Sequence, residues 1–260
     1  YTNNTLVGTD TLESIGVIGT LTTTATTSSN VGDYPITGES KVYGNYTVTI
    51  VDGTYTIEEK AITVIAEDKT SKYGVASLET LTARLAIAGD TENGEDYTNN
   101  TLVGTDTLES IGVIATLTTT ATTNSNVGDY PITGINGKYG NYIVTVIQGT
   151  YTITGKEITV IAEDKTSKYG ASLETLTARL AVAGDAQNGE DYTNNTLVGT
   201  DTLQSIGVTG ALTTTATTSS TVGEYPITGE SKAYGNYTVT IKPGTYTITE
   251  KEITVIAEDK

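Results

Sequence analysis

The stretch Tyr142-Ile-Val-Thr-Val-Ile147, followed by Thr150-Tyr-Thr-Ile-Thr154, carries the pattern that decides the fold. In both segments apolar or aromatic side chains stand at alternate positions, with β-branched Thr or Val residues between them. Successive side chains of a β-strand point to opposite faces, so this alternation predicts two half-buried strands. Gly149 lies between them and suits a tight turn.

The residues before this stretch have the same character. Leu117–Thr122 and Tyr130–Thr133 also alternate, and Gly or Asn residues separate the predicted strands. Residues 77–86 and 107–111 allow a short helix as an alternative, although the Thr residues in the first segment have poor helix propensity. Short strands with frequent turns predict an all-β fold built from β-sandwich modules similar to immunoglobulin domains.

The chain contains one module three times. Tyr1–Asp10 returns unchanged as Tyr97–Asp106 and as Tyr192–Asp201, at intervals of 96 and 95 residues. This period exceeds the roughly 20–50 residues of a solenoid unit, so each copy is predicted to be a domain of about 95 residues. The predicted division is a truncated repeat at 1–60, complete repeats at 61–156 and 157–251, and the start of another at 252–260. Because the chain starts and stops inside a repeat, we expect it to be part of a longer protein.

The junction between repeats has almost no linker. Strand-like Tyr151–Thr154 is separated from strand-like Ile158–Ile161 by only three residues. Such a short connection limits hinge motion, unlike a long Gly/Ser-rich linker. We therefore expect an extended rod, with roughly 30–40 Å per module if strands of 8–10 residues lie along its axis.

The composition disfavours an enzyme. Cys, His, Met, Trp and Phe are all missing from the 260 residues, whereas Tyr occurs 17 times. Without His and Cys the chain has no imidazole base, no thiolate and no usual zinc ligand. The recurring carboxylate pairs Glu67-Asp68 and Glu163-Asp164 follow a predicted strand without a cleft-forming insertion, so we expect no catalytic residues. Four Tyr residues recur with the same spacing, and at least two of them are expected to point inward and supply the large apolar side chains of a core without Phe and Trp. They are Tyr130, Tyr139, Tyr142 and Tyr151.

The net charge of −17 argues against nucleic acid as a partner. An acidic surface repels phosphate, and the only Arg residues are Arg84 and Arg179. No apolar run approaches the roughly 20 residues that a membrane span needs. Targeting signals, if any, are expected outside this stretch of sequence.

Six ordered motifs of the repeat resemble the MBG repeats of prokaryotic cell-surface adhesins. In the third repeat they are Ile158–Lys165, Ser167-Lys-Tyr-Gly170, Leu197–Leu203, Val222-Gly-Glu-Tyr-Pro-Ile227, Tyr234–Val239 and Gly244-Thr-Tyr-Thr-Ile248. The resemblance covers essentially the whole chain and implies an extracellular, tandem, all-β stalk. The name of the family refers to mucin binding, which by itself identifies a module and no ligand site.

An acidic insert at residues 89–100 departs from this pattern, because the family's repeats are usually shorter there. Its carboxylate and amide oxygens, which recur in the next repeat, are hard ligands of the kind that Ca²⁺ prefers. The spacing does not fit an EF-hand, so a solvated acidic turn is the alternative. The candidate calcium ligands are Asp90, Asn93, Glu95 and Asp96, with Asp185, Asn188, Glu190 and Asp191 in the next copy.

These observations predict structural stalk repeats of a secreted or cell-surface adhesin, which project a binding region from the cell. The partners expected are neighbouring repeats of the same chain. One alternative is a subunit of a self-assembling extracellular filament or surface layer, in which copies of the chain bind one another. Another is a repeat that itself binds host or microbial glycans such as mucin. Calcium is the only cofactor that the sequence suggests.

Overall fold

A computed structural model describes residues 5–92, 95–187, 190–191 and 195–258 of the chain. Contacts divide the chain into two compact units whose boundaries pass through the second sequence repeat. Unit 1 comprises Tyr1–Glu67, Leu81–Thr118 and Ile132–Gly149, and unit 2 comprises Asp68–Thr80, Thr119–Pro131 and Thr150–Lys260. One end of the second repeat therefore belongs to the same compact unit as the whole third repeat.

Unit 1 contains the first repeat and one sheet of the second. Its sheets have the strand orders β1-β2-β5, β3-β4 and β13-β14-β6-β8, and a small hairpin pairs β9 with β10. Its elements are 3₁₀ helices η1 (Ile18–Thr20) and η2 (Ile114–Thr116) and strands β1 (Thr22–Thr23), β2 (Gly32–Thr37), β3 (Lys41–Tyr43), β4 (Tyr46–Val48), β5 (Gly53–Ile57), β6 (Lys60–Ala66), β8 (Ala83–Leu85), β9 (Thr91–Glu92), β10 (Glu95–Asp96), β13 (Gly137–Tyr139) and β14 (Tyr142–Ile147).

Unit 2 contains both sheets of the third repeat. Their strand orders are β18-β16-β24-β23 and β17-β25-β22-β21, and β19 pairs with β20 in a hairpin. The elements are β7 (Lys69–Lys72), β16 (Lys156–Ala162), β17 (Lys165–Lys168), β18 (Ala178–Leu180), β19 (Ala186–Gln187), β20 (Glu190–Asp191), η3 (Thr209–Ala211), β21 (Thr213–Thr214), β22 (Gly223–Thr228), β23 (Lys232–Tyr234), β24 (Tyr237–Lys242) and β25 (Gly244–Thr249).

Three further strands pass from one unit to the other. They belong to a four-stranded sheet of order β11-β12-β15-β7. They are β11 (Thr118–Thr119), β12 (Gly128–Thr133) and β15 (Gly149–Thr154).

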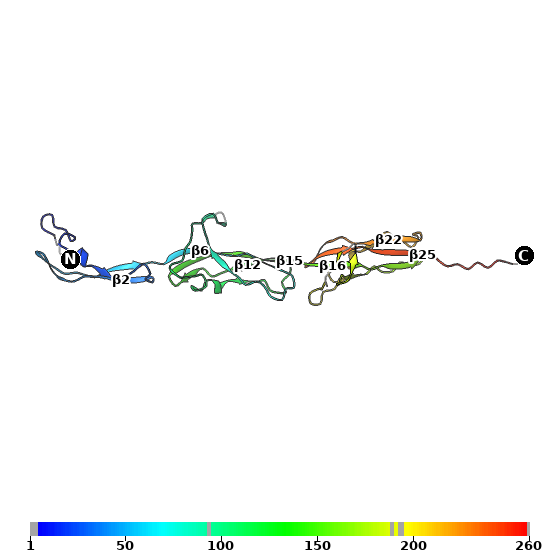
Figure 1. Cartoon of the computed structure of the whole chain (residues 1–260), viewed down its shortest axis with the longest axis horizontal. Helices are drawn as coiled ribbons and strands as arrows, with labels where there is room; N and C mark the ends of the chain where they lie inside the picture. Colours follow the sequence, from blue (N-terminus) through cyan, green and yellow to red (C-terminus); the bar gives the residue numbers. More distant parts are fainter. Residues whose placement is uncertain (1–4, 93–94, 188–189, 192–194, 259–260) are drawn as a thin grey trace. The chain divides into compact units, whose positions relative to one another are not determined.

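The third repeat is a β-sandwich with one core (Figure 1). Val160 and Val239 from one sheet and Ile227 and Tyr246 from the other are at most 1% exposed and belong to the same buried cluster. Along β24 buried and exposed side chains alternate, which is the period-2 pattern of a strand with one face in a core. The prediction of an all-β fold of sandwich repeats is confirmed, and the described residues contain no α-helix.

The opening strand of each complete repeat contributes to both sheets. β16 runs parallel to β24, and after a short crossing β17 runs parallel to β25 in the other sheet. The crossing requires Gly244, because a Cβ atom there would lie 2.4 Å from the carbonyl oxygen of Ala162. The backbone N–H of Thr245 donates a 2.7 Å hydrogen bond to Asp164 Oδ1 at the same place. The second repeat crosses in the same way, with β6 parallel to β14 and β7 parallel to β15.

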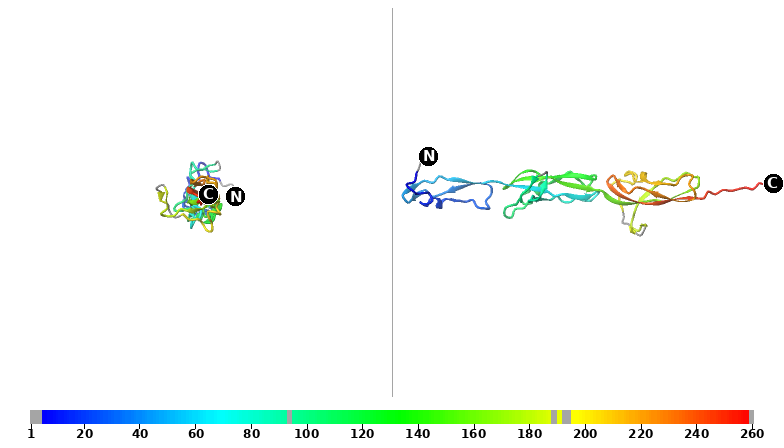
Figure 2. Two further views of the ribbon diagram at one scale, coloured as in Figure 1. Left: turned by 90° about the vertical axis from the view of Figure 1, so that its right-hand side faces the viewer. Right: turned by 90° about the horizontal axis from the view of Figure 1, so that it is seen from above.

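Of the predicted strands, Tyr142–Ile147 is β14, and 150–154 lies within β15. Leu117–Thr122 is mostly a loop and forms only the two-residue β11. The helical alternative for 77–86 does not occur, since that segment ends in β8, and 107–111 forms hydrogen-bonded turns. After β8 and after β18 the chain leaves the sandwich in a projecting hairpin (Figures 1 and 2).

Candidate functional site

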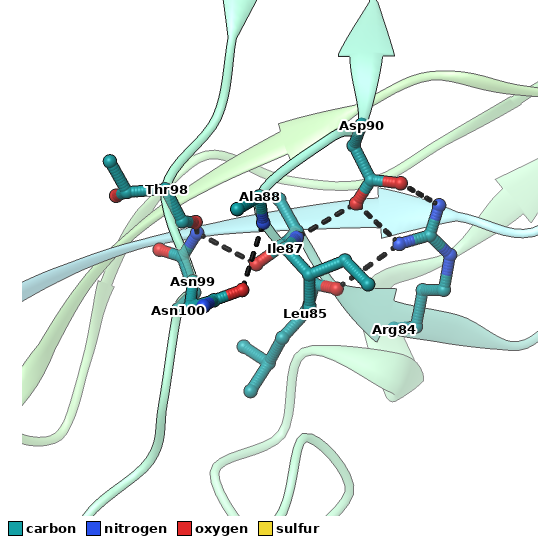
Figure 3. Close-up of polar contacts among 9 residues, drawn as sticks. Arg84, Leu85, Ile87, Ala88, Asp90, Thr98, Asn99 and Asn100 are labelled. Carbon is teal, nitrogen blue, oxygen red and sulfur yellow. Dashed lines mark hydrogen bonds and ion pairs between the residues drawn. The ribbon is translucent and has the colours of Figure 1, made fainter.

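An Arg–Asp pair joins β8 to the acidic insert at the base of its hairpin (Figure 3). Arg84 on β8 donates two hydrogen bonds to the carboxylate of Asp90, of 2.6 Å to Oδ2 and 2.8 Å to Oδ1. The backbone N–H of Ile87 donates a third, of 2.7 Å, to Oδ2. A bidentate guanidinium–carboxylate pair is among the stronger charge-assisted contacts in proteins. Asp90 therefore closes the turn that follows β8.

Two Asn residues fasten the returning strand of the insert to the sandwich (Figure 3). Asn99 Oδ1 accepts a 2.9 Å hydrogen bond from the N–H of Ala88. The side-chain amide of Asn100 donates to the carbonyl oxygens of Ala86 and Thr98, and its Oδ1 accepts from the N–H of Thr63. The base of the hairpin is therefore held by side chains that satisfy backbone groups.

The same base recurs in the third repeat. Arg179 donates to both carboxylate oxygens of Asp185 at 2.7 Å, and the N–H of Val182 donates to Oδ2. Hydrogen bonds from the guanidinium and from this N–H lower the pKa of Asp185 to about 2, and the corresponding groups lower the pKa of Asp90 to about 2. Both carboxylates are ionised at neutral pH and neutralised by a fixed Arg.

The candidate calcium ligands are only partly placed by the structure. Asp90 and Asp185 have both oxygens bonded to Arg. Glu95, Asp96, Glu190 and Asp191 lie in β10 and β20, for which the structure describes the backbone. Asn93 and Asn188 lie outside the described residues. Within the described part of the chain no three acidic residues form a group that could hold a metal ion. Calcium binding at the insert stays a prediction.

The recurring carboxylate pairs lie where the opening strand crosses between sheets. Glu67 accepts a hydrogen bond from the hydroxyl of Thr82, and Asp68 Oδ1 accepts a 2.7 Å bond from the N–H of Thr150. Glu163 and Asp164 make the equivalent bonds in the third repeat. These carboxylates hold strands in place.

A second candidate site lies in unit 2, where Tyr73 and Gly74 of the second repeat contact the third. The ring of Tyr73 packs edge-on against that of Tyr237, with centroids 5.5 Å apart and an interplanar angle of 84°. Gly74 has a φ of +76°, and a Cβ atom there would lie 2.2 Å from a methyl carbon of Val198. The turn and the close approach both require glycine. We call these residues the Tyr-Gly tip.

The surface that receives the tip is preformed by the core of the third repeat. The hydroxyl of Tyr237 accepts a 2.7 Å hydrogen bond from the N–H of Val198 and donates one of 2.7 Å to Asp201. Burial raises the pKa of Tyr237 to about 12, and the bond to the Asp201 carboxylate acts in the same direction. Tyr73 adds a 3.4 Å hydrogen bond to the same carboxylate. We call Val198, Asp201 and Tyr237 the receiving face.

An Asn residue joins neighbouring repeats at both junctions. In unit 2, Asn236 Oδ1 accepts a 2.9 Å hydrogen bond from the N–H of Val127, and its amide donates to Asn126 Oδ1 at 2.9 Å. In unit 1, Asn141 makes the same pair of bonds to Val31 and Asn30. Contacts between neighbouring repeats, the partners that the sequence predicted, are therefore present at each junction.

A shallow groove of about 330 Å³ lies in unit 1 beside the returning strand of the insert. Tyr97, Thr98, Thr63 and Asn100 are among its lining residues. Both amide hydrogens of Asn100 are already donated to backbone carbonyls. Asn100 therefore has no spare amide hydrogen, and glycan binding by the repeat stays a prediction.

From sequence, the Ser-Lys-Tyr-Gly motif at 71–74 and 167–170 served only to identify the family resemblance, and its role at the junction was not predicted. A signal was present: Tyr73 and Gly74 follow a strand, recur as Tyr169 and Gly170, and have no position in the predicted alternation of the core. The core prediction itself is confirmed for Tyr142 and Tyr151, which are 1% and 0% exposed.

Tandem β-sandwich repeats whose neighbours contact each other directly define a class of tandem β-repeat proteins. The chain matches the MBG domain (YGX type) family over residues 1–56, 62–152 and 158–247, and it belongs to that family. The resemblance inferred from the motifs is thereby confirmed. No curated protein matches the chain. None of the described helices is long and apolar enough to cross a membrane.

Proposed function

We propose that the chain forms the stalk of a secreted or cell-surface adhesin and holds a binding region away from the cell. MBG repeats are consistent with this role, because they are repeats of surface proteins. The observation that carries the proposal is the direct contact between repeats. β15 ends at Thr154 and β16 begins at Lys156, so Gly155 alone separates them, and the Tyr-Gly tip and Asn236 bridge the junction beside it.

The mechanism is geometric. Contacts on several sides of a one-residue connection resist bending, whereas a flexible linker allows it. A net charge of −17 also makes neighbouring modules repel one another, which favours an extended chain. In this proposal the repeats supply length, and the chain has no catalytic role.

Small-angle scattering tests the stalk. At the limit of low protein concentration we expect a thin rod of about 100 Å, from roughly 30–40 Å per module. The Tyr73→Ala variant should give a broader distribution of lengths, because its junction loses the ring contact, and Tyr169→Ala is the matched control. A compact particle, or a wild-type chain as flexible as Tyr73→Ala, would contradict the proposal. The same measurement with added calcium tests the acidic insert. If the insert binds calcium, the scattering profile or the unfolding midpoint should change, and a chelator should reverse the change.

A further inference from the structure

The opening strand and the last strand of the third repeat run side by side in the same direction. β24 continues into β25 across Pro243 alone, so this closing strand, like the opening strand formed by β16 and β17, passes from one sheet to the other. β16 is parallel to β24 from Lys156 opposite Tyr237 to Ile161 opposite Lys242. β17 is parallel to β25 in the other sheet. The opening and closing strands therefore pair with each other in both sheets.

Hydrogen bonds outside the two ladders join the same two strands. Where the opening strand begins, the N–H of Lys156 donates to the carbonyl oxygen of Asn236 at 3.0 Å. Where both strands cross between the sheets, the N–H of Thr245 donates to Asp164 Oδ1 at 2.7 Å. The connection between the opening and closing strands thus continues through the crossing.

A buried side-chain bond adds to this connection. The hydroxyl groups of Ser167 on the opening strand and Tyr246 on the closing strand are hydrogen-bonded at 2.7 Å. Ser167 is 8% exposed and Tyr246 is 0% exposed, so water hardly competes for the bond. The second repeat has the same bond, also of 2.7 Å, between Ser71 and Tyr151. Both complete repeats therefore tie the two strands together inside the sandwich.

The direction of the two strands decides how the third repeat responds to a pull. The chain enters this repeat at the start of β16 and leaves it at the end of β25 (Figure 1). Because the opening and closing strands are parallel, these two points lie at opposite ends of the pairing. A pull on the chain moves the strands past each other along their length. The evenly spaced bonds of the parallel ladders are then loaded together and have to break together.

An antiparallel hairpin behaves differently. β23 and β24 form such a hairpin, and its bonds would open one after another if its open ends were pulled apart. Sliding of the parallel strands is also opposed by packing, because a slip of one residue turns buried side chains to the other face. Ile158 and Val160 on β16 are 3% and 0% exposed, and Val239 on β24 is 1% exposed. The core therefore holds the register that a pull would have to break.

The same arrangement recurs in the second repeat, and the two repeats are connected through it. β6 is parallel to β14, and β7 is parallel to β15. Gly155 alone lies between β15 and β16. Tension therefore passes from the closing strand of the second repeat directly into the opening strand of the third.

We propose that each complete repeat is a load-bearing module, in which the opening and closing strands form a shear clamp against tension along the chain. The inference rests on the proposed stalk, because a stalk that holds a binding region transmits any pull on that region. Resistance to forced unfolding depends on the rate of unfolding and not on the free energy of unfolding. A repeat of ordinary thermodynamic stability is then strong in this one direction.

Single-molecule force spectroscopy in two directions tests the clamp. The chain contains no Cys, so two engineered cysteines, kept reduced until handles are attached, fix the points of pulling. In the full chain, Glu157→Cys with Glu250→Cys pulls along the strands. Glu157→Cys with Thr238→Cys pulls the facing starts of β16 and β24 apart. All three side chains are exposed, so both double variants keep the fold.

The force along the strands should be the larger one. At the same loading rate, the first double variant should unfold at a force at least about twice that of the second, because its bonds break together. The length released should be roughly 250–300 Å in both, which identifies unfolding of the third repeat. Urea unfolding midpoints of the two double variants should agree, so that the difference in force comes from the direction of pulling.

A matched pair of substitutions assigns the force to the clamp. Ser167→Ala removes the buried bond to Tyr246 and should lower the force along the strands, while the force that pulls β16 and β24 apart stays the same. Ser220→Ala is the control, because the hydroxyl of Ser220 accepts a hydrogen bond from the N–H of Thr217 outside the clamp. It should leave both forces unchanged.

Two results would overturn the proposal. One is an equal unfolding force in the two directions, and the other is a Ser167→Ala variant that weakens the repeat no more along the strands than across them. Either failure is distinguishable from failure of the stalk. Scattering measures the stiffness of the junctions without load, whereas the force measurement acts within one repeat.

Discussion

The Tyr-Gly tips of the second and third repeats share a backbone conformation but not their surroundings. Tyr73 packs on Tyr237, and Gly74 lies against Val198, whereas Tyr169 and Gly170 face solvent. Since both tips keep the same hydrogen bond and the same φ, their shape comes from the repeat that carries them. The neighbour supplies only the burial. The tip is therefore a preorganised connector. Substitutions at Gly74 and Tyr73 should lower the free energy of unfolding more than substitutions at Gly170 and Tyr169.

The largest expected difference is between Gly74→Ala and Gly170→Ala. Both place an L-residue at φ +76°, which costs about 1–2 kcal/mol. At Gly74 the new Cβ also collides with Val198, and overpacking adds about 1–3 kcal/mol. Urea unfolding followed by Tyr fluorescence should show the larger loss at Gly74. Equal losses would mean that the contact with Val198 is not maintained in solution.

Tyr73→Ala and Tyr169→Ala should differ by a smaller amount. The first removes a buried edge-to-face ring pair, worth about 0.5–1.5 kcal/mol beyond the area it covers. The second removes an exposed ring and should stay within about 0.5 kcal/mol of the wild type. Calorimetric unfolding is the measurement. If Tyr169→Ala costs as much as Tyr73→Ala, the two tips are not in different environments.

Removing the Asn contact tests the other side of the same junction. Asn236→Ala should lower the free energy of unfolding by about 1 kcal/mol, because it removes bonds to Val127 and Asn126. Asn45, the exposed equivalent in the first repeat, is the control, and Asn45→Ala should change little. Urea titrations of both variants distinguish these outcomes. An equal effect of the two substitutions would show that Asn236 acts within its own repeat.

The hairpin bases provide a comparison in which no difference is expected. Asp90 and Asp185 have pKa values lowered to about 2 by equivalent Arg partners. A lowered folded-state pKa stabilises the fold above the unfolded value near 4, and this contribution is lost as the pH falls toward 2. Asp90→Asn and Asp185→Asn should each reduce stability at pH 7, by similar amounts. Their difference from the wild type should shrink between pH 4 and pH 2.

Unfolding midpoints measured at pH 7, 4 and 2.5 check this expectation. A difference from the wild type that stays constant down to pH 2.5 would mean that the carboxylate charge does not supply the stability. Unequal effects of the two substitutions would show that the hairpins, like the tips, depend on their neighbours.

Much of the fold follows from local pattern. Alternation along Tyr142–Ile147 predicts β14, because a strand with one face in a core needs period 2. The pattern did not give the parallel pairing of β6 with β14, since apolar alternation does not specify which distant strand lies alongside or in which direction. The site was predicted less well. From sequence, Asp90 was predicted to be a calcium ligand. Its bidentate hydrogen bonds with Arg84 form because the fold brings β8 and the hairpin turn together.

The sequence by itself determined the repeat, the all-β class and the membership of the MBG family, because periodicity and motif order are properties of the chain alone. Tertiary structure decided which distant residues meet. Gly74 lies against Val198 of the next repeat, and Asp68 Oδ1 accepts a hydrogen bond from the N–H of Thr150, 82 residues further along the chain. The physical reason is that strand pairing sets these approaches, and the pairing of distant strands is not specified by the local pattern of either segment.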